Sequence, residues 1–359
     1  MNQKKEIPVI DLFSGPGGLG EGFSSLNGGK TFEILVSAEM DPAAHQTLTL
    51  RAYFRRIKDD PELAGAYYEF CAGRSSIPYD DKTQPLWDAA RQEALCLTLG
   101  EPESDAILDR AINERLPKDS ECVLIGGPPC QAYSLVGRSR NKGSANYSAE
   151  HDKRHFLYRE YLRVLQRTKP AVFVMENVKG ILSSRVGGRR IFHDILADLV
   201  DPCAALGIKD DQGATYRIHA LATETIFRKG MDASSIDPSD FVIHAEDHGI
   251  PQARHRVILL GVRSDIESNP SILPSVAPQL AVHDAIKDLP KLRSRLSKQS
   301  DSGEDWANLV RKHCTELADL AAAEAMNDLS NGLKAAASKI SAARTPGGLR
   351  VPLREDQRC

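Results

Sequence analysis

The segment GGPPCQAYS, residues 126–134, contains the side chain best suited to covalent chemistry. Pro128 and Pro129 fix two successive φ angles and remove two N–H donors, so Cys130 is presented in nearly one backbone geometry. Such preorganisation helps a side chain to meet a reacting atom at a set angle, and a thiolate is a strong nucleophile. Most free cysteines are instead small buried residues, which is our expectation for Cys71, Cys96, Cys122 and Cys203. The two prolines favour a nucleophilic role for Cys130.

The glycine-rich turn SGPGGLG, which follows the apolar run IPVIDLF, is a second candidate site. Gly15, Gly17 and Gly20 match G-x-G-x-x-G between a strand and a helix, and the acidic Glu39 follows at about the spacing of a dinucleotide-binding site. Such glycines allow close backbone approach to a ligand, and the carboxylate suits ribose hydroxyls. NAD and S-adenosylmethionine both satisfy the pattern, and a tight turn without a ligand is the alternative. Phe13 at the strand end suits either an adenine contact or the core.

Three further charged residues could take part in chemistry. Glu176 ends the apolar run AVFVM and precedes Asn177. In HGIPQARHRVILLGV, Arg254 and Arg256 are two residues apart, so they project from the same face of an extended segment. Two such guanidinium groups suit recognition of a phosphate or carbonyl group, or clamping of a carboxylate. A structural salt bridge and a solvated edge strand are the alternatives.

The elements that must position these residues alternate between strands and helices. We expect strands at 7–13, 32–41, 93–100, 121–127, 170–178, 216–223 and 256–263, with helices after Asp41, over 103–116 and over 155–169. The alternation predicts an α/β fold with a doubly wound, mostly parallel sheet covered on both faces. Ligands of such sheets bind beyond the carboxyl ends of the strands. The glycine turn, Glu39, Cys130 and Glu176 all follow predicted strands, so they should gather at one edge.

Bulk composition adds few constraints. A formal net charge of −3 neither requires nor excludes an anionic partner. Seven scattered cysteines without a CxxC pair indicate free thiols in a reducing compartment, and no cysteine spacing suggests zinc. The amino terminus has no apolar signal region, and no segment has the ~18 apolar residues of a membrane span. We therefore expect a cytoplasmic protein without a membrane partner.

The strand–helix pattern weakens after residue 263. VHDAIKDLPKLRSRL is followed by a Ser/Asp-rich stretch and by an alanine-rich segment, predicted as one helix over 320–343. Residues 55–95 are polar and are predicted to form an insertion or an extended helical region. We therefore expect a catalytic domain over 1–263 and a partial or linker region over 264–359.

Taken together, DLFSGPGG, the strand ending at Glu39, GGPPCQAYS, ENV (176–178) and QARHR (252–256) resemble the DNA cytosine-5 methyltransferases, in the order of that family. The resemblance covers about residues 7–263 and is closest to enzymes of bacterial restriction–modification systems. It implies a Rossmann-like, S-adenosylmethionine-dependent methyltransferase fold with a helical carboxyl-terminal tail. The combination of PPCQ, ENV and QxRxR is far more specific than the glycine turn, and it excludes NAD.

The resemblance implies that S-adenosylmethionine, the methyl donor, is bound at the glycine turn. Glu39 would bind its ribose and Met40 would lie beside its adenine. The other residues expected along the cofactor are Phe13, Ser14, Gly15, Gly17, Gly18 and Pro128.

The resemblance also implies the catalytic roles and requires no metal. Cys130 would attack C6 of a cytosine, after which C5 accepts the methyl group. Glu176 would contact N3 and the exocyclic amine, while Arg254 and Arg256 would hold O2, the nearby backbone and Glu176. The substrate would be double-stranded DNA with the target base flipped out of the stack, because a stacked base does not expose C6. The polar loop 134–148 would close over that base and touch phosphate.

The match to the family has gaps. The family's acidic residue for the adenine amine is not evident, and Glu101 is the candidate. The tail leads toward a target recognition domain that looks incomplete, so specificity could come from another polypeptide. Two alternatives remain open: an RNA (tRNA) cytosine-5 methyltransferase, and a non-catalytic module that binds cofactor or DNA. A cognate restriction endonuclease is the expected partner within the same system.

Overall fold

The computed structural model describes residues 6–118, 120–129, 157–186, 189–209, 213–277, 280–287, 289, 293–297 and 300–342, without the side chains of 185, 186, 189 and 190. Cys130 and the predicted loop 134–148 therefore lie outside the described residues. The chain divides into two compact units, Met1–Ala281 and Val282–Cys359.

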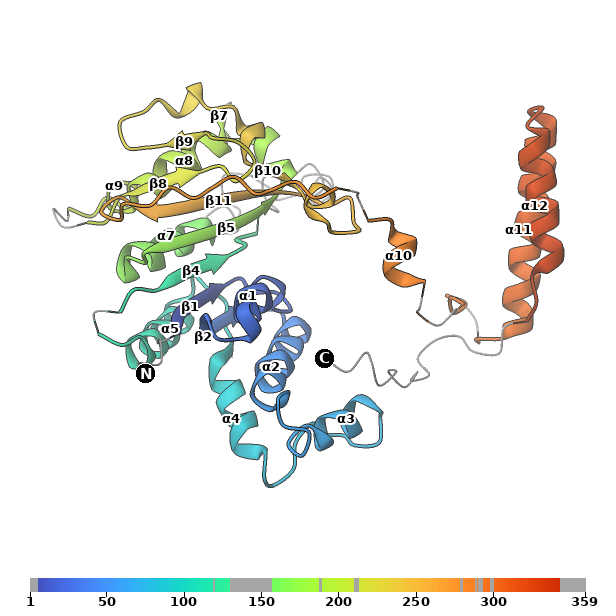
Figure 1. Ribbon diagram of the computed structural model, residues 1–359, viewed down its shortest axis with the longest axis horizontal. Coiled ribbons are helices and arrows are strands. Elements are labelled where there is room, and N and C mark those ends of the chain that lie inside the picture. Colours follow the sequence, from blue (N-terminus) through green and yellow to red (C-terminus); the bar gives the residue numbers. More distant parts are fainter. Residues whose placement is uncertain are drawn as a thin grey trace, which may run out of the picture. The chain divides into compact units, whose positions relative to one another are not determined.

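The first unit is built on one nine-stranded sheet, with strand order β3-β2-β1-β4-β5-β11-β8-β9 and β10 paired to β11 (Figure 1). Its strands are β1 (Ile7–Leu12), β2 (Phe32–Glu39), β3 (Ala94–Cys96), β4 (Val123–Gly126), β5 (Val172–Val178), β8 (Tyr216–His219), β9 (Ile226–Phe227), β10 (Val242–His244) and β11 (His255–Arg263). A separate two-stranded sheet joins β6 (Arg185–Val186) to β7 (Arg189–Arg190).

The strands from β3 to β5 are parallel, whereas β11, β8 and β9 continue the sheet in antiparallel pairing. The strand order reverses between β1 and β4, which is the place where ligands bind in open α/β sheets. Because β11 runs against β5, Arg256 at the start of β11 is paired with Val178 at the end of β5. The antiparallel pairing thus brings the predicted arginines to the edge where the parallel strands end.

Helices cover both faces of this sheet, as predicted from the alternating pattern. The helices described in this unit are α1 (Gly18–Ser24), α2 (Pro42–Ile57), α3 (Gly65–Cys71), α4 (Gln84–Glu93), α5 (Pro102–Arg115), α7 (Leu157–Thr168), α8 (Ile191–Val200) and α9 (Pro202–Leu206). Five short 3-10 turns complete the described part of this unit: η1 (Leu26–Gly28), η3 (Lys179–Ser183), η4 (Ala233–Ser235), η5 (Pro238–Phe241) and η6 (Ala245–His248).

Successive residues of β1 face opposite layers, as the pleat of a strand requires. Ile10 and Leu12 pack with the buried faces of α5, α7 and α8. Val9 belongs to a smaller cluster on the other face, where Leu19 and Phe23 of α1 cover it. The fold is therefore the predicted doubly wound α/β arrangement.

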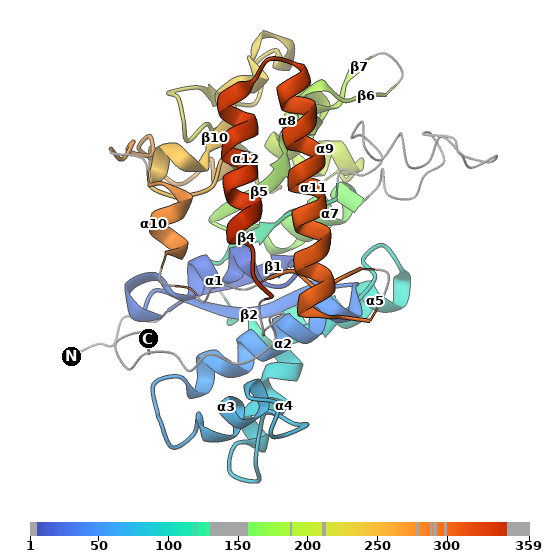
Figure 2. The same cartoon turned by 90° about the vertical axis from the view of Figure 1, so that its right-hand side faces the viewer.

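Residues 55–95, predicted as an insertion or an extended helical region, contain α3 and α4, which lie on the far side of β2 from β1 in both views (Figures 1 and 2). Helix α2 begins as predicted, with Pro42 in its first turn and the Asp41 carboxylate accepting the Ala44 N–H at 2.8 Å. Tyr53 of α2 and Trp87 of α4 meet edge to face, with ring centroids 5.5 Å apart. The insertion thus has a small aromatic core of its own.

Several predicted element boundaries were wrong. The strand predicted at 93–100 is only Ala94–Cys96, and the strand predicted at 216–223 ends at His219. Helix α8 was not predicted.

Cys71 and Cys96 are exposed rather than buried, whereas Cys122 and Cys203 are buried as expected. All four are free thiols, and burial raises the pKa of Cys122 to about 12, which keeps it unreactive.

The second unit contains α10 (Val282–Ile286), α11 (Gly303–Ala323) and α12 (Asn327–Lys339). The single helix predicted over 320–343 is wrong, because the chain turns between α11 and α12, where Ala325 adopts a positive φ of 60°. The two helices run side by side in Figures 1 and 2. Alanine side chains at 307, 318 and 321 are buried in this hairpin, and small residues allow such close helix approach.

Among the residues that the structure describes, no helix combines the length and apolar character needed to cross a bilayer.

The tight packing of Gly261 against Phe173 gives a test of the fold. A Cβ atom at Gly261 of β11 would lie 2.0 Å from Cε1 of the fully buried Phe173. We expect Gly261→Ala to lower the free energy of unfolding by roughly 3 kcal/mol or to prevent folding, because a packed core cannot move aside. Gly22→Ala is the matched control: nothing lies within 4 Å of its Cβ position on α1, and alanine favours a helix. Equal urea denaturation midpoints for the two variants would contradict the β5–β11 packing.

Candidate active site

The diproline segment after β4 is fastened to the end of β5. The Asn177 side chain is buried and donates from Nδ2 to the Pro128 carbonyl oxygen at 3.0 Å. A Cβ atom at Gly127 would lie 3.3 Å from Oε2 of Glu176, so a larger residue there would crowd this carboxylate. The backbone that leads into Cys130 is therefore held beside Glu176, as the sequence predicted for the two motifs.

Glu176 is paired with Arg256 across the antiparallel β5–β11 ladder. Nε of Arg256 lies 2.8 Å from Oε1 of Glu176, an ion pair without the alignment of a hydrogen bond. Nη1 of Arg256 donates to the His255 carbonyl oxygen at 2.8 Å, which fixes the guanidinium plane. Both side chains are about one quarter exposed, with values of 30% for Glu176 and 24% for Arg256, so they are open to a ligand. Arg254 is exposed just before β11.

Glu39, at the end of β2, closes the glycine turn. Its Oε2 accepts the Gly15 N–H at 2.8 Å and its Oε1 accepts the Asp41 N–H at 2.7 Å. Gly15 has φ 56° and Gly17 has φ 86°, values that favour glycine. A carboxylate has about four acceptor positions, so Glu39 can still accept hydrogen bonds from a ligand.

A cleft of about 850 Å³ opens at the carboxyl ends of β1 to β4. Phe13, Glu39 and Met40 line one part of it, and Gly127 and Pro129 line another. Clefts of this size hold nucleotide-sized ligands. Three of the predicted cofactor residues, Phe13, Glu39 and Met40, thus share one cavity with the stem of Cys130.

Phe13 has a strained backbone at this cleft. Its φ is 54°, a left-handed conformation that costs a bulky residue about 1–3 kcal/mol. Its ring packs against the core while lining the cleft, so the two expectations for this residue, adenine contact and core packing, are compatible.

The remaining predicted residues are placed less directly. The Ser14 hydroxyl is buried and donates to the Asp11 carbonyl oxygen at 2.9 Å, so it supports the turn from beneath. Gly17 is buried and its Cβ position would lie 2.8 Å from Cδ1 of Leu48. Gly18 is exposed, and Pro128 is buried behind the cleft wall. Cys130 lies outside the described residues.

A model of one protein family, the C-5 cytosine-specific DNA methylases, matches residues 86–201 and 239–344, more than half of the chain. The chain belongs to the C-5 cytosine-specific DNA methylase family.

Two relatives agree with this membership by sequence. The type II methyltransferase M.Bpa9945I of Bacillus paralicheniformis is 31% identical over 307 residues, which cover 80% of this chain and 61% of that protein. The type II methyltransferase M.AquIA of Picosynechococcus sp. is 28% identical over 258 residues, covering 72% of this chain and 73% of that protein. A prophage-encoded Escherichia coli protein assigned as a DNA modification methyltransferase has a crystal structure that aligns with a TM-score of 0.44 and 21% identity, covering 83% of this chain and 59% of that one. The methylase chain therefore spans 61% of the length of its Bacillus relative.

Two acidic residues of the methylase cleft lie far from Glu39 in the sequence. Glu101, the candidate for the adenine amine, lines the cleft at the start of α5. Glu160 of α7 also lines the cleft and was not predicted; its Oε2 accepts a hydrogen bond from Nε of Arg163 at 2.9 Å. Burial raises the pKa of Glu160. In the sequence, a glutamate of an amphipathic helix that lines a cleft looks the same as one that faces solvent. Only the packing of Glu160 against Gly100 shows that it belongs to the cleft.

A buried acid lies beneath the glycine turn of the methylase. Asp11 of β1 is 1% exposed, and neither carboxylate oxygen has a hydrogen-bond partner among the described residues. A Cβ atom at Gly20 would lie 2.7 Å from its Oδ2, so α1 rests directly on this group. Burial raises the pKa of Asp11 to about 7, against the opposing effects of Ser14 and Arg55.

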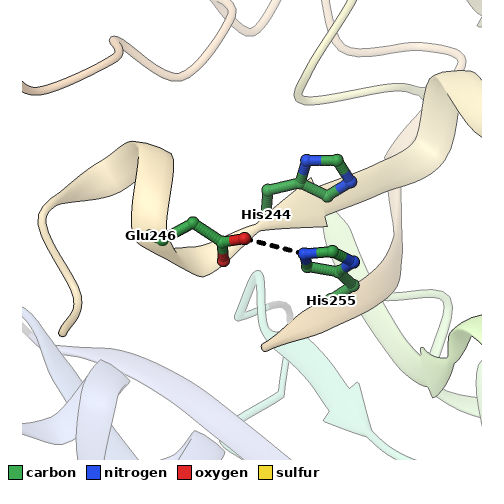
Figure 3. A group of neighbouring side chains, drawn as sticks. All are labelled: His244, Glu246 and His255. Atoms are coloured by element: carbon green, nitrogen blue, oxygen red, sulfur yellow. Dashed lines mark hydrogen bonds and ion pairs between the residues drawn. The ribbon is translucent and has the colours of Figure 1, made fainter. Parts of the chain in front are cut away.

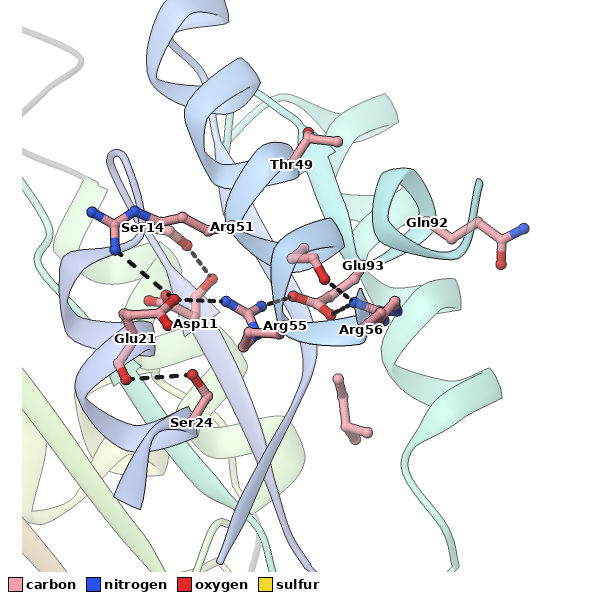
Figure 4. A network of polar contacts seen from close by, with 12 residues as sticks. Asp11, Ser14, Glu21, Ser24, Thr49, Arg51, Arg55, Arg56, Gln92 and Glu93 are labelled. Atoms are coloured by element: carbon pink, nitrogen blue, oxygen red, sulfur yellow. Dashed lines mark hydrogen bonds and ion pairs between the residues drawn. The ribbon is translucent and has the colours of Figure 1, made fainter. Parts of the chain in front are cut away.

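An ion-pair network next to Asp11 joins α1, α2 and α4 (Figure 4). Arg55 of α2 donates to Glu21 of α1 at 3.0 Å and also to the buried Glu93 of α4. Arg56 donates to the second oxygen of Glu93 at 2.8 Å. The buried carboxylate of Glu93 is therefore fully paired, and the network ties the glycine-turn helix to the insertion.

The elevated pKa of Asp11 predicts a pH dependence of stability. The native state binds the Asp11 proton between pH ~4 and ~7 while the unfolded chain does not, so the contribution to stability is present at acid pH and lost as the pH rises toward 7. We expect Asp11→Asn, which stays neutral, to gain stability relative to the parent chain by on the order of 3 kcal/mol between pH 5 and 8. Urea denaturation at several pH values measures this difference. Parallel pH curves for the two proteins would show that Asp11 is solvated or paired.

Proposed function

We propose that this methylase transfers a methyl group from S-adenosylmethionine to C5 of a flipped-out cytosine in double-stranded DNA, with Cys130 as the nucleophile. One observation carries the proposal: the backbone stem of Cys130 lines the cleft shared with Phe13 and Glu39, and its other side adjoins the Glu176–Arg256 pair. Methyl transfer requires the methyl donor, the nucleophile and the acid to contact the same cytosine ring. The stem of Cys130 lies between the cleft and the Glu176–Arg256 pair, so it is placed to bring them together.

The cleft fits S-adenosylmethionine, the methyl donor implied by the family. Its volume of about 850 Å³ suits a nucleoside with an amino-acid tail. Glu39 would accept ribose hydroxyls, Phe13 and Met40 would flank the adenine, and Glu101 and Glu160 are the acids available for its exocyclic amine. The wall of the cofactor site would be shaped by the remaining predicted residues, Ser14, Gly15, Gly17, Gly18 and Pro128. When bound, the donor supplies an electrophilic methyl group.

The protein groups would act on the cytosine. The Cys130 thiolate forms a bond to C6, because neutral C5 is a poor nucleophile until this adduct supplies electron density. Glu176 stabilises the adduct at N3 and the exocyclic amine, and Arg256 positions the Glu176 carboxylate. Once C5 carries the methyl group, a base removes the C5 proton and the C6–sulfur bond breaks, which restores the thiolate. Arg254 is available for O2 of the base or a nearby phosphate.

Covalent trapping tests this function. In 5-fluorocytosine the fluorine at C5 cannot leave as a proton does, so the bond between the protein and the base should not break. With S-adenosylmethionine present, we therefore expect a covalent complex of the chain with duplex DNA that survives a denaturing gel. Cys130→Ala should abolish the adduct while cofactor affinity, measured by calorimetry, stays within about twofold. Cys96→Ala, which removes an exposed thiol, is the matched control and should still react.

The same experiment separates the alternatives. Trapping on fluorinated tRNA but not on DNA would establish an RNA methyltransferase. Cofactor binding without an adduct on either substrate would establish a non-catalytic module. Pairing with a restriction endonuclease and catalysis without a metal remain predictions.

Cofactor binding depends on Glu39 in this proposal. We expect Glu39→Gln to weaken S-adenosylmethionine binding about tenfold or more, because a neutral amide is a poorer acceptor for ribose hydroxyls and cannot accept both the Gly15 and Asp41 N–H groups. Glu33→Gln, on the same strand but exposed, is the control and should leave the affinity unchanged. Equal affinities for both variants, measured by calorimetry, would remove Glu39 from the site.

A further inference from the structure

The corner formed by β10, η6 and β11 gathers three ligand-type side chains that methyl transfer does not use (Figure 3). His244 and His255 are opposite each other in the antiparallel β10–β11 ladder, and their rings stack with centroids 3.9 Å apart. Glu246 of η6 reaches back so that its Oε1 lies 2.7 Å from Nε2 of His255. Within the described ranges, this is the one group whose ligand atoms, one from each of three residues, all lie within 4.8 Å of one another.

We propose that His244, Glu246 and His255 bind one divalent transition-metal ion of the zinc class. Two imidazole nitrogens and one carboxylate oxygen form a donor set that suits Zn²⁺, Co²⁺ or Ni²⁺ far better than Mg²⁺, which prefers oxygen ligands. Ligands about 2.1 Å from a tetrahedral ion are roughly 3.4 Å apart. The distances in the cluster, from 2.7 Å up to 4.8 Å, bracket that separation.

One carboxylate oxygen of the cluster has unmet bonding capacity. Oε2 of Glu246 is shielded from solvent and has no hydrogen-bond partner among the described residues. A shielded carboxylate oxygen without a donor is unfavourable, and an ion bound by this carboxylate would relieve that cost. This oxygen of Glu246 is therefore available to an ion bound by the cluster.

To bind an ion, the cluster needs side-chain rotation and loss of the proton that Nε2 of His255 donates to Glu246. The strand pairing of Ile243 with Arg256 and of His244 with His255 fixes the backbone. Imidazole lone pairs lie in the ring plane, so the stacked His244 ring must turn to aim a nitrogen at the ion shared with His255. Its side chain is 42% exposed and its Nδ1 lies 3.6 Å from an Asp247 oxygen, a distance that constrains it weakly. Water, or Asp247 itself, would complete the coordination.

The ion would brace the strand end that carries Arg256. Residues 244 and 255 enclose the segment with Gln252 and Arg254, and the His255 carbonyl oxygen accepts a hydrogen bond from Arg256. An ion bound to both histidines would restrict this segment. Its role is structural, so it is separate from the reaction at Cys130, and its test does not depend on the proposed methyl transfer.

Calorimetric titration of the full chain, freed of metal by EDTA, tests the site with Zn²⁺, Co²⁺ and Mg²⁺. We expect one Zn²⁺ per chain, a higher melting temperature with Zn²⁺, and no Mg²⁺ binding. His244→Ala and His255→Ala should each weaken Zn²⁺ binding at least about tenfold. His248→Ala is the matched control: this histidine lies on the same η6 turn, bonds the Pro274 carbonyl oxygen and should bind Zn²⁺ as the parent does.

Two further measurements distinguish this site from thiol ligation and from a loss of folding in the variants. The Co²⁺ spectrum should lack thiolate charge-transfer bands. The presence of such bands would show that the exposed Cys71 or Cys96 binds the ion instead. Glu246→Gln preserves side-chain shape, so it should weaken Zn²⁺ binding even if a histidine variant folds poorly. Absence of Zn²⁺ binding, unchanged affinity in His255→Ala and Glu246→Gln, or thiolate bands with Co²⁺ would each overturn the proposal.

Discussion

The pairing of β11 against β5 is the constraint on which the site depends. A sheet that remained parallel would place the start of β11 at the opposite edge from the end of β5. Because β11 is antiparallel, Arg256 enters the sheet where Glu176 leaves it, and an ion pair forms across the ladder. Gly261, further along β11, is the residue that lets this strand lie against Phe173. Packing deep in the sheet thereby determines whether the acid at its edge has a partner.

Each half of the site is held in shape by short polar contacts at a strand end. Asn177 holds the diproline stem, and Glu39 holds the glycine turn through two backbone N–H groups. Each contact uses a side chain to satisfy backbone groups at a strand end, where the ladder no longer does so.

Two unfavourable features lie in or directly beneath the glycine turn. Phe13 has a left-handed backbone, and Asp11 is buried without a hydrogen-bond partner among the described residues. Both belong to β1 or the turn after it, so strain and desolvation occur in the element closest to the proposed cofactor. Stability is often lower where a fold is arranged for binding, and the apolar layers on both sheet faces compensate here.

The sequence alone determined the α/β class, the helix start at Asp41 and Pro42, and the gathering of the glycine turn, Glu39 and Glu176 at one edge, because these follow from local periodicity, capping and strand direction. It could not determine that 320–343 is broken into two helices, since alanine-rich sequence is helical on either side of a turn. Glu160, Asp11 and the His244–Glu246–His255 cluster were likewise invisible, because their significance lies in which distant residues surround them. Only the tertiary structure decides those neighbours: burial, charge pairing and strand register act across the sheet, between residues that no local pattern connects.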